Sequence, residues 1–134
     1  MTPVRGVPAN EASVVWPLIE DLVKKGLGPD CGQSPDDLLT SLECEQAQLF
    51  ATPTLDCILM TEIDLLPHEK VMNIFLAAGK LPKDYATVLH ALEGWARFML
   101  CNAMEIRNFR KGLVRILAPS GYRVIGGILR KELF

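Results

Sequence analysis

The spacing of apolar residues changes along this chain, and that change limits its fold more than any other feature. Between Gln46 and Ala78 apolar residues alternate with polar ones or form short runs, as is typical of strands. Beyond Pro82 they recur every three or four residues, which is the spacing of one buried helix face. The chain is therefore predicted to place a long helix directly after several adjacent strands.

The same reasoning assigns elements to the rest of the chain. Asn10 is expected to cap the first helix, in which Pro17 either introduces a kink or marks a true start near Trp16. Ser34 followed by Pro35 is the clearest helix start, because serine caps helices and proline suits their first turn. The predicted elements are a strand at 4–7, helices at 11–25 and 34–44, strands at 46–51, 56–63 and 71–78, a helix at 85–99, a strand at 104–107, a helix at 109–117, and a strand or bent strand pair at 122–133.

This order of elements predicts an α/β (α+β) fold in a single domain spanning residues 1–134. Three adjacent strands followed by alternating helices and strands favour a mixed, mostly antiparallel sheet with helices on both faces. In such a sheet a ligand is expected beside a strand-to-helix turn, which here is the segment 79–84.

Composition narrows the classes of protein that this chain can represent. The sequence is 49% hydrophobic and 22% charged with a net charge of −2, which fits a folded protein and gives no field to recruit nucleic acid. Its four cysteines are far apart and lack a nearby histidine, so we expect no metal site. Cys57 and Cys101 lie in apolar runs, where cysteine behaves as a small buried hydrophobe, so we expect a reducing, cytoplasmic setting. Charged residues and prolines interrupt every apolar run, so we expect no membrane span and a soluble protein.

Several segments of the second half resemble the GNAT (N-acetyltransferase) superfamily. They are the helix end Ala91-Leu-Glu-Gly-Trp-Ala-Arg97, the strand Ala103-Met-Glu-Ile-Arg107, the pair Gly121-Tyr122 with Arg123, and the ending Ile128-Leu-Arg-Lys-Glu-Leu133. The ending formed by Gly121-Tyr-Arg123 and Leu129-Arg-Lys-Glu-Leu133 is especially similar to the small GNAT-like proteins encoded by tailed bacteriophages. The resemblance implies a GNAT fold and, in an active protein, transfer of an acetyl group from acetyl-CoA to an amine.

The resemblance also implies where acetyl-CoA would bind: on the strand and loop that carry Phe75, Ala77, Gly79, Lys80 and Lys83. Active relatives hold the CoA pyrophosphate with a glycine-rich loop whose N–H groups approach the phosphates. This chain has one glycine there and a proline that lacks an N–H. Its two lysines could instead supply positive charge. Alternatively, the segment is an ordinary turn that ends at a capping Asp84.

Two residues are candidates for catalysis within the same resemblance. Glu62 lies on the strand before the docking strand, where a base could take the proton of an acceptor amine. Alternation places it on the face opposite Thr61 and Ile63, although a glutamate there could be merely solvated. The short helix that often carries a catalytic tyrosine has none, and Tyr122 could either serve as the acid or pack at the start of the last strands.

Two functions follow, and the sequence leaves both open. The first is an N-acetyltransferase, or a binder of acetyl-CoA, with an unidentified amine acceptor. The second is a non-enzymatic virion component or protein-interaction module, for which the first helix with Trp16 could supply a partner surface. Assembly as a homo-oligomer or into a virion is also open. Basic residues near the end form either a solvated face or a patch for an acidic partner or nucleic-acid phosphates; they are Arg107, Arg110, Lys111, Arg115 and Arg123.

Overall fold

The computed structural model describes residues 4–27, 33–80, 83, 85–107 and 111–134. Seven strands form one sheet in the order β1-β2-β3-β4-β5-β7-β6. The strands are β1 (Arg5–Val7), β2 (Gln48–Ala51), β3 (Cys57–Leu65), β4 (Lys70–Gly79), β5 (Ala103–Ile106), β6 (Arg123–Ile125) and β7 (Ile128–Glu132). All neighbouring strands are antiparallel except β4 and β5, which are parallel. The predicted mixed, mostly antiparallel sheet is thus confirmed.

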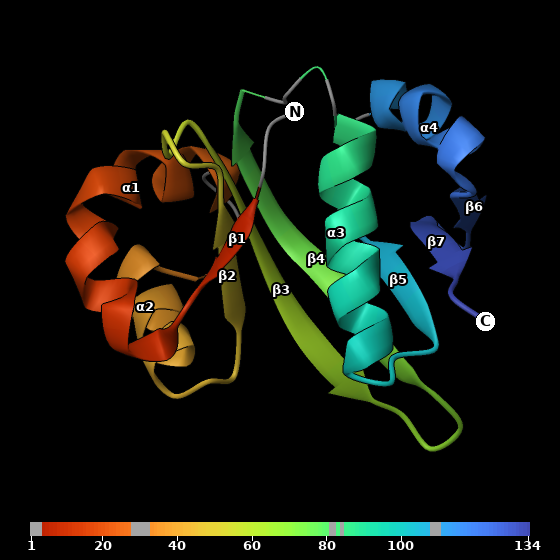
Figure 1. Ribbon diagram of the computed structural model, residues 1–134, viewed down its shortest axis with the longest axis horizontal. Helices are drawn as coiled ribbons and strands as arrows, with labels where there is room; N and C mark the ends of the chain where they lie inside the picture. The colour runs from red at the N-terminus through yellow and green to blue at the C-terminus, as the bar shows by residue number, and fades with distance from the viewer. Residues whose placement is uncertain (1–3, 28–32, 81–82, 84, 108–110) are drawn as a thin grey trace.

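Helices cover both faces of this sheet, as the sequence predicted (Figure 1). The helices α1 (Ala12–Leu27) and α2 (Pro35–Glu43) lie on one face, over the strands of the first half of the chain. The helices α3 (Tyr85–Phe98) and α4 (Lys111–Leu117) lie on the other. The sheet therefore separates two apolar cores.

Each core has its own set of buried residues, fixed by alternation along the strands. The core beneath α1 and α2 includes Trp16, Ile19, Leu38, Leu49 and Met60. The core beneath α3 includes Met72, Leu92, Met104, Tyr122 and Leu129. Because successive side chains of a strand point to opposite faces, neighbouring strand residues fall into different cores.

The sequence predicted the start of α2 correctly, but it did not predict the start of α1. At Ser34 the side chain accepts a hydrogen bond from the N–H of Asp37 (3.2 Å) while the Asp37 carboxylate accepts from the N–H of Ser34 (3.1 Å). This reciprocal capping confirms the predicted start of α2. Asn10, however, lies within a short 3-10 turn at Ala9–Glu11, so it does not occupy the predicted capping position. Pro17 lies inside α1, which begins at Ala12 and not near Trp16.

The last predicted element is a pair of strands. β6 and β7 form a hairpin in which Ile125 pairs with Ile128. The two residues between them, Gly126 and Gly127, have φ values of 58° and 81°. A two-residue turn with positive φ at both positions matches the twist of a hairpin, and glycine adopts it without strain.

Candidate active site

The parallel strands β4 and β5 separate partway along the sheet. They pair from Val71 opposite Ala103 to Ile74 opposite Ile106, and β4 then continues through residues 75–79. Among the described residues no strand pairs with this part of β4 on the β5 side. An open strand edge presents backbone N–H and C=O groups that can pair with an extended ligand.

A β-bulge marks the point where the strands separate. On β3, the adjacent residues Met60 and Thr61 pair with Leu76 and Ile74 of β4, so Phe75 is the extra residue of the bulge. A bulge bends its strand and redirects the side chains beyond it. The bulge thus coincides with the end of the pairing between β4 and β5.

The opening is flanked by α3 and α4. The Tyr85 hydroxyl, in the first turn of α3, donates a hydrogen bond to the carbonyl oxygen of Ile116 in α4 (3.1 Å). Ala77 of β4 is exposed although it lies in the middle strand of the sheet. Its small side chain leaves the space beside this part of β4 accessible.

The end of β4 is closed by contacts with the start of β3. Gly79 has a φ of 99°, and a Cβ there would collide with the backbone carbonyl oxygen of Asp56. The N–H of Lys80 donates a hydrogen bond to the same oxygen (2.8 Å). The Asp56 carboxylate accepts hydrogen bonds from the hydroxyls of Thr52 (2.7 Å) and Thr54 (2.8 Å), which hold its pKa below the ordinary value. The close packing at Gly79 and the hydrogen bond from the Lys80 N–H therefore hold the end of β4 against the start of β3.

Only part of the predicted phosphate loop lies within the described residues. Lys80 and Lys83 are exposed there. The alternative interpretation of the loop relied on Pro82 and a capping Asp84, which lie outside the described residues. Within the described part of the loop, these two lysine side chains are available to an anion.

Glu62 and Phe75 come together at one pocket on the α2 side of the sheet. The pocket has a volume of about 200 Å³ and lies between β3, β4 and α2. Its polar lining includes Ser41 and Gln46 in addition to Glu62. Glu62 is half-buried, and Ile63 packs into the opposite core, as alternation predicted. The bulge is thus close to the predicted base.

Tyr122 lies on the other side of the sheet, in the core beneath α3. It is 1% exposed, and its hydroxyl donates a hydrogen bond to Glu93 Oε2 (2.9 Å). Glu93 Oε1 also accepts one from Lys131 Nζ (2.9 Å). Burial, followed by the charge of Glu93, raises the pKa of Tyr122 above its ordinary value. The structure therefore does not bring Tyr122 and Glu62 together.

A row of polar residues crosses the sheet just before the opening. Glu62 pairs with Asn73, Asn73 with Glu105, and Glu105 with Arg130. The Asn73 Nδ2 donates a hydrogen bond to Glu62 Oε1 (3.3 Å). Asn73 and Glu105 were not among the predicted site residues, because their position depends on strand register, which no local pattern reveals.

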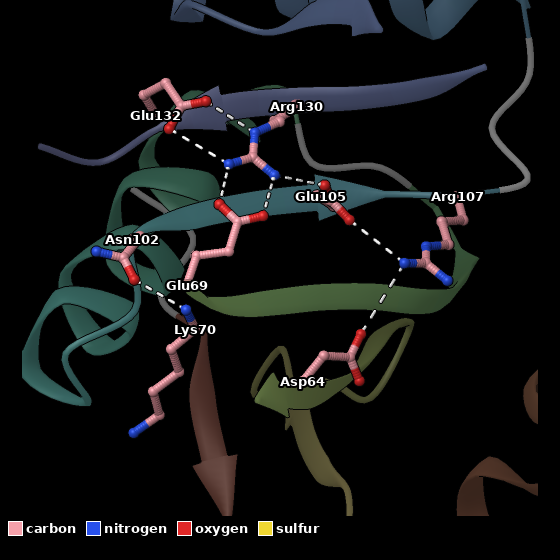
Figure 2. A network of polar contacts seen from close by, with 8 residues as sticks. All are labelled: Asp64, Glu69, Lys70, Asn102, Glu105, Arg107, Arg130 and Glu132. Atoms are coloured by element: carbon pink, nitrogen blue, oxygen red, sulfur yellow. Dashed lines mark hydrogen bonds and ion pairs between the residues drawn. The ribbon is translucent and has the colours of Figure 1, made fainter. Parts of the chain in front are cut away.

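Arg130 joins this row to a larger ionic network, shown in Figure 2. Its guanidinium contacts Glu69 (2.6 Å), Glu105 (2.7 Å) and Glu132 (2.8 Å). These hydrogen bonds, the one to Glu69 first, raise the pKa of Arg130, and Arg130 lowers the pKa of Glu69.

Arg107 of the predicted basic patch contacts Glu105 (3.4 Å) and Asp64 (4.0 Å). The two arginines are thus held by carboxylates.

No protein-family model and no curated protein sequence matches the chain. Solved structures do match it in fold. An N-acetyltransferase of Staphylococcus aureus has a TM-score of 0.70 at 11% identity, covering 99% of this chain and 98% of that one. A predicted acetyltransferase of Clostridium acetobutylicum, in a structure with acetyl-CoA, has a TM-score of 0.67 at 11% identity, covering 94% and 92%. A GNAT-family acetyltransferase of Listeria monocytogenes has a TM-score of 0.60 at 12% identity, covering 98% and 94%.

These likenesses establish that the chain has the fold of the GNAT acetyltransferases. At such low identity they establish the fold alone. Within the described residues, no group of His, Cys, Asp and Glu side chains could hold a metal ion. No helix in that part of the chain is both long and apolar enough to cross a membrane.

Proposed function

We propose that this protein is an N-acetyltransferase that binds acetyl-CoA in the opening between β4 and β5. The observation that supports this most is the open edge of β4 beyond Ile74, which begins at the Phe75 bulge. Its backbone groups suit the amides of an extended pantetheine chain, because such a chain can pair with an open strand edge. Ala77 leaves room for the chain beside β4.

The backbone of this chain suits the pantetheine part of acetyl-CoA better than its pyrophosphate. The N–H of Lys80 already bonds to Asp56, so a cradle of backbone amides at Gly79 and Lys80 does not fit a pyrophosphate. The exposed side chains of Lys80 and Lys83 fit it as point charges. We therefore propose that lysine charge replaces the glycine-rich loop.

Acetyl-CoA, when bound, supplies an acetyl thioester that an uncharged amine can attack. The residues of this chain prepare the amine. We propose that Glu62 accepts the proton that the amine must lose, since its carboxylate is half-buried and lines a pocket beside the bulge. Phe75 lines the same pocket, so the pocket adjoins the cofactor strand.

For Tyr122 we propose packing in preference to acid catalysis. A catalytic acid must reach the leaving group, whereas the Tyr122 hydroxyl is buried and bonded to Glu93. Its raised pKa also makes it a weaker acid than an ordinary tyrosine. Its hydroxyl supplies one of the two hydrogen bonds that hold the buried Glu93 carboxylate.

The second candidate is a non-enzymatic module, the role expected if the resemblance to phage proteins extends to a virion component. The occupied Lys80 N–H favours it, since it leaves phosphate binding weaker than in active relatives. The sequence had offered Trp16 as a contact residue, but Trp16 is 5% exposed, and the exposed apolar residues of α1 are Val14 and Leu18. Part of the phage-like ending also has a structural reason: Gly121 has a φ of 98°, and Leu129 and Leu133 are buried.

Calorimetric titration of the full chain with acetyl-CoA and with CoA separates the two candidates. The proposed enzyme binds both with heat release that saturates at one ligand per chain. Absence of heat at millimolar ligand, together with an unchanged melting temperature, rules out the proposed acetyl transfer and leaves the non-enzymatic module.

A further inference from the structure

Four large apolar side chains are exposed at the end of the sheet opposite the opening between β4 and β5. They are Leu65 (78% exposed), Leu66 (50%), Phe98 (79%) and Leu100 (74%), and we call them the end patch. The first two lie at the hairpin between β3 and β4, and the other two at the end of α3 and just beyond it. Figure 1 shows this hairpin and this end of α3 at the same end of the molecule.

Strand alternation and one hydrogen bond bring the two halves of the end patch together. Ile63 packs in the core beneath α3, so Leu65, two positions further along β3, points to the same face of the sheet. Leu65 pairs with Lys70, whose Nζ donates a hydrogen bond to the carbonyl oxygen of Met99 (2.6 Å). Met99 lies between the two residues that α3 contributes. The hairpin and the end of α3 are therefore neighbours.

Further hydrogen bonds fix the backbone around the end patch. The N–H of Lys70 donates to Asn102 Oδ1 (2.8 Å), and the N–H of Asn102 donates to the carbonyl oxygen of Lys70 (2.6 Å). The hairpin turn is closed by the N–H of Leu66, which donates to the carbonyl oxygen of Glu69 (2.8 Å). A surface fixed in this way loses little conformational entropy when another molecule covers it.

Leu100 occupies a backbone position that suits glycine. It has a φ of 65°, in the left-handed region. Its N–H donates to the carbonyl oxygen of Arg97 (2.9 Å), and the N–H of Cys101 donates to that of Ala96 (2.9 Å), which together form the Schellman ending of α3. Any residue other than glycine is strained at this position, and the exposed leucine gains little from burial in its own chain. A contact outside the chain would explain why a leucine is retained there.

The size of the end patch suits a weak contact between two copies of the chain. Its four side chains present about 400–550 Å², if each fully exposed side chain presents roughly 150–200 Å². A two-fold contact buries the same surface on both copies, so its apolar core amounts to about 800–1,100 Å². A polar rim brings such a contact to roughly 1,200 Å², the lower limit of standard specific interfaces.

Charged side chains beside the end patch are held by other groups of the same chain. Glu69 pairs with Arg130, and Lys70 and Arg97 each donate a hydrogen bond to a backbone carbonyl oxygen. These four residues carry one negative and three positive charges, and Arg130 is further bound by two more carboxylates. Such a balanced surface gives little repulsion between identical copies and little attraction to a strongly charged partner. The charges therefore favour a second copy over nucleic acid or an anionic membrane.

We propose that the end patch joins two copies of this chain into a reversible dimer about a two-fold axis. Leu100 is retained in its strained conformation because the dimer buries its side chain. The opening between β4 and β5 stays free in both copies, since it lies at the far end of β4. This inference goes beyond the proposed acetyl transfer and does not depend on it.

Sedimentation velocity of the full chain at increasing protein concentration measures the dimer directly. We expect the mass to rise from one chain to two across the micromolar range, because the contact is small. A mass of one chain at every concentration up to the millimolar range would overturn the proposal. So would a mass that passes two chains and keeps rising, because a two-fold contact closes after two copies.

Variants separate association from folding. Leu100→Gly removes the apolar side chain and suits the positive φ, so we expect at least tenfold weaker association. The melting temperature of the dilute, monomeric protein should be unchanged or raised. Leu65→Ser, on the hairpin, should weaken association as well. Wild-type association in both variants would overturn the proposal.

The matched control lies on α1. Val14→Ser with Leu18→Ser removes two apolar side chains that are about as exposed as Leu65 and Leu100. We expect this double variant to associate as wild type does. If it becomes monomeric while Leu100→Gly still forms the dimer, the contact lies on α1 and the proposal is wrong.

Two further measurements distinguish the dimer from other roles. If the protein stays monomeric and sediments with phosphatidylcholine vesicles, the end patch contacts a membrane and the proposal is wrong. Calorimetric titration of Leu100→Gly with acetyl-CoA should give the affinity of wild type, because the opening is remote from the end patch. The dimer and the acetyl transfer are therefore tested by separate readouts, and either can fail while the other stands.

Discussion

Gly79 packs directly against the backbone carbonyl of Asp56, which leaves no space for a side chain. The sequence analysis predicted this glycine as a residue of a phosphate loop. In the structure it also allows the backbones of β3 and β4 to pack closely at their junction. We expect Gly79→Ala to lower the free energy of unfolding by about 1–3 kcal/mol, because it adds a collision to a positive φ. Denaturant unfolding measures this change.

The matched control for this substitution is Gly94→Ala in α3. A Cβ at Gly94 meets no atom within 4 Å, and alanine favours helix over glycine by about 1 kcal/mol. We expect it to stabilise the protein. If both substitutions had the same effect on stability, the contact with Asp56 would have no energetic role.

Reversing the charges of Lys80 and Lys83 should weaken CoA binding without weakening pantetheine binding. If these side chains hold the pyrophosphate, Lys80→Glu with Lys83→Glu lowers CoA affinity about tenfold or more, and added salt diminishes the difference. Arg5→Glu with Arg123→Glu, on the two edge strands, gives the same change of net charge as a control. Equal losses in both double variants would indicate a general effect of charge.

Replacing Tyr122 by phenylalanine tests whether this residue packs or catalyses. Tyr122→Phe leaves Glu93 Oε2 without its bond from the hydroxyl, so we expect a loss of about 1–3 kcal/mol in unfolding free energy. We expect CoA affinity to stay the same, and the acetylation rate with an amine that the wild type acetylates to keep its pH profile. A rate loss of a hundredfold or more, with altered dependence at alkaline pH, would show acid catalysis instead.

The Glu69–Arg130 pair makes stability depend on acid pH. The hydrogen bond between Glu69 and Arg130 lowers the pKa of Glu69 in the folded state below the ordinary value of 4.5. The Glu69 carboxyl group therefore loses its proton more readily in the folded protein than in the unfolded chain. The stabilisation is therefore complete above pH 4.5 and is lost as the pH falls through the lowered pKa. We expect Glu69→Gln to reduce the melting temperature at pH 7, and the difference from wild type to shrink below pH 4.5.

An Arg130→Gln background isolates this pair from other acid-sensitive groups. In that background Glu69→Gln should have little effect at either pH, because the partner is already absent. A persisting pH-dependent effect there would assign the acid sensitivity to another contact of Glu69.

Much of the fold could be predicted from local patterns. The change from alternation to a three- and four-residue spacing located β4 and α3, and Ser34 with Pro35 located α2. These signals are local because they reflect the geometry of single elements. The prediction that Asn10 caps the first helix was wrong, because Asn10 lies in a 3-10 turn at Ala9–Glu11 that precedes the helix.

The site was harder to predict because it depends on how strands align. Glu62 could be named from its strand and face, but Asn73 becomes its neighbour only through the register of β3 and β4. The bulge at Phe75 is likewise a property of that pairing, and the sequence of β4 alone contains no mark of it. Arg130 meets Glu69 across 61 positions of sequence, which no local spacing encodes.

The central claim, that acetyl-CoA occupies the opening between β4 and β5, is tested most directly by filling that opening. Ala77→Tyr places a large side chain beside the open edge of β4, and Ala91→Tyr places the same side chain on an exposed position of α3. Calorimetric titration with acetyl-CoA should show saturable binding to wild type and to Ala91→Tyr. Ala77→Tyr should bind acetyl-CoA at least tenfold more weakly while keeping the melting temperature of wild type. Equal affinity of Ala77→Tyr and wild type would contradict the claim.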